Sequence, residues 1–128
     1  MKHLFIPKRL AEQAFDKGFN EICIGYYLIS NVALINRHKH VPKTCTFAPL
    51  YQQMMSWFKE HHDLKIEILH SDGTGLYKFG FWKSNRDNDI GKWERMGYIG
   101  LYYTWNDAAD KAIQEALNLI EDDRKRNI

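Results

Sequence analysis

The chain has 128 residues, the size of one ordinary domain, and 45% of them are hydrophobic, so it can fill a core and is not expected to be disordered. Its formal net charge of +2 is too small to indicate a dedicated polyanion-binding protein. Because residues 1–6 lack the apolar run of a signal peptide and no stretch is apolar enough to span a bilayer, we expect one cytoplasmic domain over 1–128 that does not enter a membrane.

An amphipathic helix is predicted over 8–17. Pro7 suits its first turn, because the N–H that proline lacks would be unpaired there in any case, and Gly18 is a typical C-terminal cap. Apolar residues recur at helical spacing, and the side chains expected to share the buried face are Leu10, Ala11, Ala14 and Phe15.

The stretch from 20 to 48 has weaker signals. Apolar residues alternate with other residues between 22 and 28, which predicts a short strand with one buried face. Residues 31–47 include a polar run and are expected to form an irregular excursion, with a hairpin arm as the alternative. We therefore expect 1–47 to be an N-terminal helix followed by an irregular extension.

Two amphipathic helices are predicted within the remaining segment, 48–123. The first begins after Pro49, ends near residue 62 and has an apolar stripe made of Leu50, Met54, Trp57 and Phe58. The second begins after Thr104, whose hydroxyl suits an N-cap. Its apolar stripe is wide and consists of Trp105, Ala108, Ala109, Ala112, Ile113, Ala116, Leu117 and Ile120.

Three strands are predicted between these two helices. Alternation marks the first strand at 65–69, and the pair Asp72-Gly73 favours a hairpin that returns the chain through 76–83. The third strand is predicted at about 95–103, where two glycines, Gly97 and Gly100, indicate bulges or close contacts.

The expected fold class is therefore α+β. Three antiparallel strands form a meander, both flanking helices pack on its apolar face, and the N-terminal helix and short strand precede this α-β-β-β-α core.

Two stretches of the chain, 51–68 and 103–120, have a recognisable pattern. A helix ending in Trp57-Phe58 leads into a strand, and a threonine-capped helix with the sequence QEALNLI follows later. Together with Lys17-Gly18-Phe19, this pattern resembles short uncharacterised proteins carried by phages and mobile elements of gut Bacteroidetes. The resemblance implies a phage accessory role and brings no assigned activity with it.

The α-β-β-β-α order also resembles the double-stranded RNA-binding domain. That family has a lysine-rich cluster at the start of its last helix, which grips phosphates. The matching stretch here is 106–111, and it places Asp107 and Asp110 where cations are needed. The resemblance therefore implies the topology without the phosphate contact.

A zinc site would draw on the series His38, His40 and Cys45, because imidazole and thiolate are good zinc ligands. No recognised spacing supplies a fourth ligand, for which His3 or Cys23 would be needed, so a solvated basic loop is the expectation. The two cysteines are expected to be reduced.

A catalytic triad would draw on His70, Ser71 and Asp72 at the hairpin. Adjacent residues in a tight turn rarely converge on one point, and no nucleophile elbow surrounds the serine. We therefore expect no catalytic residue, no metal and no cofactor.

A candidate surface follows from strand alternation. If both helices cover one face of the sheet, the other face presents Lys65, Glu67, Lys78 and Trp82. With the neighbouring cations, the predicted surface for a nucleic acid or a protein partner consists of Lys65, Lys78, Trp82, Lys83 and Lys92.

These observations lead to two functional hypotheses. The first is a non-enzymatic phage or mobile-element accessory protein that binds a protein partner or a second copy of itself, because surplus aromatics suit an interface. The alternative is a nucleic-acid-binding module that stacks bases on aromatic side chains beside cations.

Overall fold

The computed structural model is an α+β protein, as the sequence predicts. It describes residues 4–21, 23, 25–27, 33–35, 46–84 and 93–126, with the backbone alone for 33–35, 46, 84, 93–99 and 121–126. The chain groups into two compact units, Met1–Met54 and Met55–Ile128, and each contains one three-stranded antiparallel sheet. The expectation of a single domain over 1–128 stays a prediction. Among the described residues, no helix combines the length and the apolar character that crossing a membrane requires.

The first unit contains helix α1, Lys8–Asp16, and the predicted cap at its end is confirmed. Gly18 has a φ of +103°, and its N–H donates to the Phe15 carbonyl at 3.1 Å. The next N–H, that of Phe19, reaches back to the Ala14 carbonyl at 3.0 Å. Only glycine adopts this φ without strain, so the residue type determines where the helix ends.

The predicted buried face of α1 is partly wrong. Leu10, Ala11 and Ala14 are buried, but the Phe15 side chain is 64% exposed. Successive residues are rotated by about 100° around a helix, so Phe15 lies further round than Leu10, Ala14 and Ala11, at the margin of the buried stripe.

The sheet of the first unit has the order β2-β1-β3, with β1 at Gly25–Tyr27, β2 at Ala33–Ile35 and β3 at Thr46–Ala48. The predicted short strand is thus present and central. The excursion expected at 31–47 contributes residues to both flanking strands, because Tyr26 pairs with Leu34 on one side and with Phe47 on the other. Three-residue strands are too short to show a period, which is why the sequence pattern missed the two outer ones.

The extended segment before α1 is held by backbone hydrogen bonds. The Ile6 N–H donates to the Pro49 carbonyl at 3.0 Å, and Phe5 and Leu50 form an isolated antiparallel bridge. The Tyr27 hydroxyl donates to the Ile6 carbonyl at 2.6 Å, which fixes β1 to the same segment.

Helix α2, Tyr51–His62, confirms the helix predicted at 50–62. Met54, Trp57 and Phe58 of its apolar stripe are buried. The Trp57 ring packs edge-on against Phe58, with ring centroids 5.1 Å apart.

The second unit contains the predicted meander. Its strands are β4 (Leu64–His70), β5 (Tyr77–Ser84) and β6 (Trp93–Tyr102), in the order β4-β5-β6 with antiparallel neighbours. The pairing of β4 with β5 is regular, whereas β6 shifts register twice against β5. One shift contains Gly100, which has a φ of +88°, and the other lies beside Gly97, so the predicted irregularities at these glycines are confirmed.

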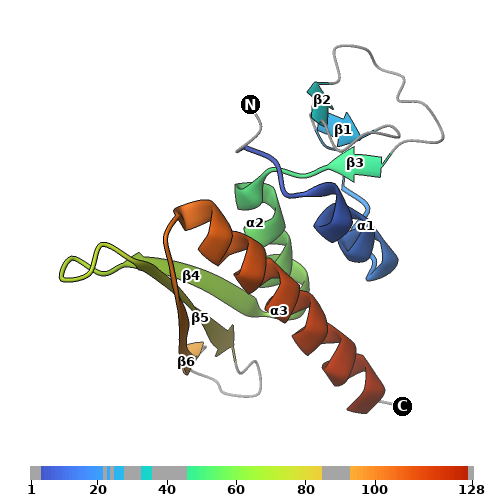
Figure 1. The fold of residues 1–128 in the computed structure, drawn as a ribbon. Helices are drawn as coiled ribbons and strands as arrows, with labels where there is room; N and C mark the ends of the chain where they lie inside the picture. The colour runs from blue at the N-terminus through green and yellow to red at the C-terminus, as the bar shows by residue number, and fades with distance from the viewer. Residues whose placement is uncertain are drawn as a thin grey trace. The chain divides into compact units, whose positions relative to one another are not determined.

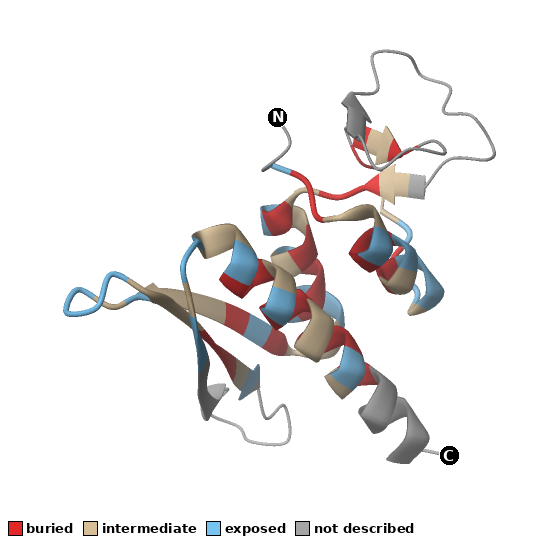
Figure 2. Cartoon of the chain, viewed as in Figure 1, coloured by how far each residue is buried: buried red, intermediate tan, exposed pale blue. Residues whose placement is uncertain are grey.

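Helix α3, Trp105–Arg126, lies across one face of this sheet (Figure 1). The Thr104 hydroxyl accepts the Asp107 N–H at 3.0 Å, so the predicted cap is confirmed. The small side chains of its alanine-rich stripe are fully buried and let the helix axis approach the strands closely. Figure 2 shows buried residues along α3 and on the strands, and those of the sheet include Leu64, Ile66, Phe79 and Phe81.

Candidate interaction surface on the sheet

The face of the sheet opposite α3, called the outer face below, has a mixed composition. Side chains alternate along a strand, so buried Ile66 and Phe81, which pair with each other, place their neighbours on the outer face. Those neighbours form cross-strand pairs, Lys65 with Trp82 and Leu69 with Lys78. The structure therefore brings three of the predicted surface residues, Lys65, Lys78 and Trp82, to one face.

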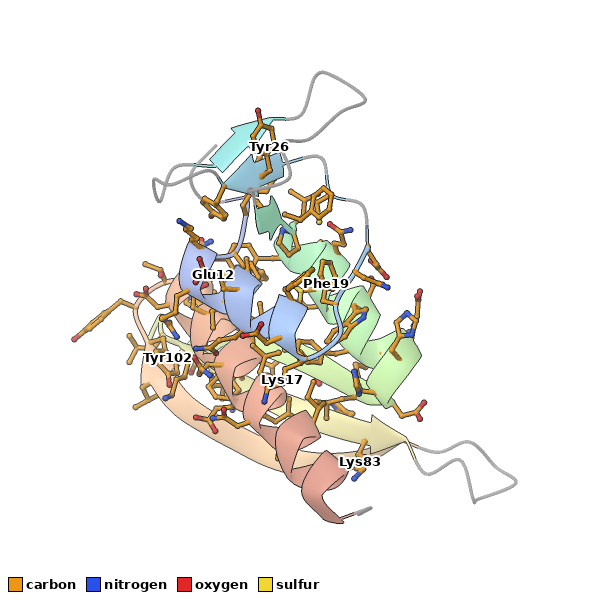
Figure 3. All side chains as sticks on the ribbon, turned by 90° about the vertical axis from the view of Figure 1, so that its right-hand side faces the viewer. Glu12, Lys17, Phe19, Tyr26, Lys83 and Tyr102 are labelled. Atoms are coloured by element: carbon orange, nitrogen blue, oxygen red, sulfur yellow. The ribbon has the colours of Figure 1, made fainter. Side chains whose placement is uncertain are left out.

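The other two predicted surface residues are not placed there. Lys83 pairs with Leu64, which is buried, so its side chain has the orientation of Phe79 and Phe81 and belongs to the face that α3 covers. It is exposed because it lies at the end of β5 (Figure 3). Lys83 was predicted only as a cation neighbouring this face, and the alternation of side chains along β5 places it on the opposite face from Trp82. Lys92 lies outside the described residues.

A carboxylate occupies the middle of the outer face. Glu67 pairs with Gly80, and its Oε2 accepts a hydrogen bond from the Trp82 indole Nε1–H, one position further along β5 on the same face. The bond holds the negative charge between Lys65 and Lys78, and it orients the indole ring across the strands. The described part of this face thus alternates in charge instead of being uniformly basic.

Apolar side chains extend the outer face at the end of β6. The Tyr102 ring lies 5.9 Å from Phe79 on the inner side, so Leu101 points the opposite way, and its side chain is 68% exposed. Tyr103, which follows the strand, is 84% exposed. Sequence reasoning did not single out Leu101, because its orientation depends on the bulge at Gly100.

The composition of the outer face resembles that of protein interfaces more than that of nucleic-acid-binding surfaces. Indole, leucine and tyrosine beside alternating charges are typical of protein interfaces. A phosphate backbone would meet cations at Lys65 and Lys78 but would also meet the fixed Glu67 carboxylate.

The start of α3 offers no substitute cation cluster. Asp107 is exposed there, and Lys111 is paired with Glu115 at 3.3 Å. Of the two acids that depart from the double-stranded RNA-binding pattern, Asp107 is therefore exposed at the start of the helix and Asp110 is half-buried. An RNA phosphate approaching this end would be repelled by Asp107.

The residues named for a triad do not form one. His70 and Asp72 are 4.0 Å apart, and the Asp72 side chain is fully exposed, so water screens their interaction. The His70 ring instead packs against Tyr77, its cross-strand partner, with ring centroids 4.7 Å apart. Ser71 is engaged through its backbone, whose N–H donates to the Leu76 carbonyl.

Of the residues named for a zinc site, only Cys23 is described, and it is a free buried thiol. Burial, and next the nearby charge of Glu21, raises the pKa of Cys23 from its ordinary 9.0 to about 12. Its Sγ lies 3.5 Å from the Glu21 carbonyl oxygen. The group is therefore a protonated thiol at neutral pH. His3, His38, His40 and Cys45 lie outside the described residues.

The chain was also compared with known proteins. No protein-family model, no curated protein and no solved structure matches it.

Proposed function

We propose that this chain is a non-enzymatic accessory protein that binds a protein partner through the outer face of its β4-β5-β6 sheet. The observation that supports this most is the combination of an oriented indole, Trp82, with a 68% exposed leucine, Leu101, on a sheet face that α3 leaves open. A large apolar side chain whose orientation is already fixed, as that of Trp82 is by Glu67, provides binding energy with little further loss of rotamer freedom.

Charge alternation on the outer face supports specificity for such a partner. A partner surface whose charges match the pattern of Lys65, Glu67 and Lys78 would be favoured, and a surface that sets like charges against them would be rejected. The accessory role on a phage or mobile element rests on the resemblance of the two helix patterns to proteins of gut Bacteroidetes, and a cytoplasmic location belongs to the same proposal.

Co-purification with matched surface variants tests the proposal. Leu101→Asp places a charge on the outer face, and Asn118→Asp places the same charge on an exposed position of α3. Proteins that co-purify with the native chain should be lost with Leu101→Asp and retained with Asn118→Asp. Equal retention by both variants would contradict binding through the outer face.

Nucleic-acid binding is the second candidate, because Lys65 is exposed and pairs directly with Trp82, a cation beside an aromatic ring. Titration of the chain with single-stranded DNA, double-stranded DNA and double-stranded RNA at low and physiological salt tests it. Binding that weakens steeply with salt and with Lys65→Glu would favour this candidate. An absence of binding at low salt would exclude it.

A further inference from the structure

The two edges of the β4-β5-β6 sheet differ in regularity. Strand β6 is interrupted by two register shifts, whereas β4 runs for seven residues in unbroken register with β5. Within the described residues β4 pairs only with β5, so its other side is a sheet edge. A regular, unbulged edge presents backbone N–H and C=O groups that can pair with another strand.

The backbone hydrogen bonds show which residues of β4 face this edge. The Ser71 N–H donates to the Leu76 carbonyl at 2.8 Å, and these two residues continue the register of β4 with β5 by one position. Backbone groups alternate in direction along an antiparallel strand. The backbone groups of residues in phase with Ser71 therefore point toward β5, and those of Leu64, Ile66, Ile68 and His70 point to the open edge.

We propose that β4 pairs antiparallel with β4 of a second copy of this chain, about a two-fold axis at Ile66. Leu64 then lies opposite the partner's Ile68, and Ile66 opposite the partner's Ile66, at the positions that exchange backbone hydrogen bonds. Lys65 lies opposite the partner's Glu67, and symmetry repeats this ion pair. These charged pairs occupy the non-hydrogen-bonded positions, where side chains across two strands are closest.

The charges select this register over its neighbours. Residues directly opposite each other in a strand pair share a face of the sheet. The two-fold axis must therefore pass through a residue and not between two residues, so alternative registers shift it by whole residues. An axis at Lys65 or at Glu67 would place that residue against its own copy, with like charges in contact. An axis at Ile68 would leave Glu67 opposite Leu69. The register at Ile66 therefore pairs both charges favourably, and it also aligns apolar with apolar residues.

The proposal goes beyond the proposed function: the two copies pair through the backbone edge of β4 and through Lys65 and Glu67 on that strand, whereas the Trp82 and Leu101 side chains that support the proposed function take no part in the pairing. The two inferences can therefore fail separately. Dimerisation would join the two sheets into one of six strands and double the outer face available to a partner.

Charge exchange tests the proposal in the full chain by analytical ultracentrifugation. The native chain is expected to sediment at twice its 15.2 kDa mass. Lys65→Glu places glutamate against glutamate, and Glu67→Lys places lysine against lysine, so each variant alone should raise the dissociation constant on the order of tenfold or more. An equimolar mixture of the two variants should recover the dimer, because every pair is again of opposite charge.

Lys78→Glu is the matched control, since Lys78 lies on the outer face but on the central strand, and it should leave the native dimer unchanged. Far-ultraviolet circular dichroism verifies folding. Glu67→Lys also removes the acceptor of the Trp82 hydrogen bond and could unfold the chain for that reason. In that case Lys65→Glu tests the proposal by itself. A monomeric native chain, a Lys65→Glu dimer as tight as the native one, or a mixture of two folded variants that stays monomeric would overturn the proposal.

Discussion

The contact between Phe5 and Gly25 gives a sharp test of packing in the first unit. A Cβ added at Gly25 would lie 2.5 Å from the Phe5 Cε1 and 2.9 Å from its Cζ, well inside van der Waals contact. The Phe5 side chain is only 3% exposed, so its ring cannot swing into solvent. Gly25→Ala should therefore force a shift in a packed region of the core.

The magnitude follows from two opposing effects. Overpacking a buried site destabilises by about 1–3 kcal/mol. Replacing glycine by alanine also reduces the entropy of the unfolded chain, which stabilises by about 0.4–1 kcal/mol. Because Gly25 does not have a positive φ, no backbone strain is added. We expect a net loss of roughly 1–2 kcal/mol in the free energy of unfolding.

Urea unfolding followed by circular dichroism measures this loss, with Gly73→Ala as the control. A Cβ at Gly73 would meet no atom within 4 Å, so the control has no packing penalty and should be neutral or stabilising by up to about 1 kcal/mol. In a Phe5→Leu background the penalty of Gly25→Ala should shrink, because the ring that causes it is gone. An equal penalty in both backgrounds, or one no larger than that of Gly73→Ala, would refute the reasoning.

Three further predictions concern other described contacts. Thr104→Ala removes the acceptor of the Asp107 N–H and should lower the stability of the chain to urea by about 1 kcal/mol, whereas Thr104→Ser should retain it. Gly100→Ala should destabilise by roughly 1–3 kcal/mol, since φ is +88° and the new Cβ would collide with the Tyr102 ring; unchanged thermal unfolding would contradict this. The pKa of Cys23 is higher in the folded chain than in the unfolded chain, so folding favours the protonated thiol. The stability that the buried thiol contributes is therefore complete below pH 9.0 and is lost as pH rises toward about 12. In a variant in which Cys45 is replaced, a thiol reagent should react with Cys23 slowly at pH 9 and faster in urea. Equal rates with and without urea would show an accessible thiolate at Cys23.

Much of the second unit was predictable because its patterns are long. The stripe from Ala108 to Ile120 repeats over several turns of α3, and every apolar residue predicted between those positions is buried. Alternation along β4 placed Ile66 on the buried face and Lys65 on the open one, as observed. A pattern of this length leaves few alternative orientations for a helix or a strand.

The register of the hairpin could not be predicted from its turn residues. A two-residue turn at Asp72-Gly73 would pair Glu67 with Lys78, whereas the longer loop closed by Ser71 and Leu76 pairs Glu67 with Gly80. This difference brings the Glu67 carboxylate to the Trp82 indole. The sequence thus indicates which residues share the outer face but not which of them touch.

The prediction for Phe15 failed for a different reason. Apolar character alone placed it in the buried stripe of α1, but its position at the margin depends on how wide the covering surface is. Similarly, the strands at 33–35 and 46–48 form because β1 lies between them, a contact between distant parts of the sequence. Local patterns carry no information on such pairing.

Photo-crosslinking in living cells tests the central claim most directly. A photoreactive amino acid is incorporated at Leu101 on the outer face and, as the control, at Asn118 on α3. We expect a discrete crosslinked protein from position 101 that is absent from position 118 and survives nuclease treatment. An equal yield from both positions, no protein adduct from position 101, or an adduct that nuclease removes would contradict a protein partner on this face.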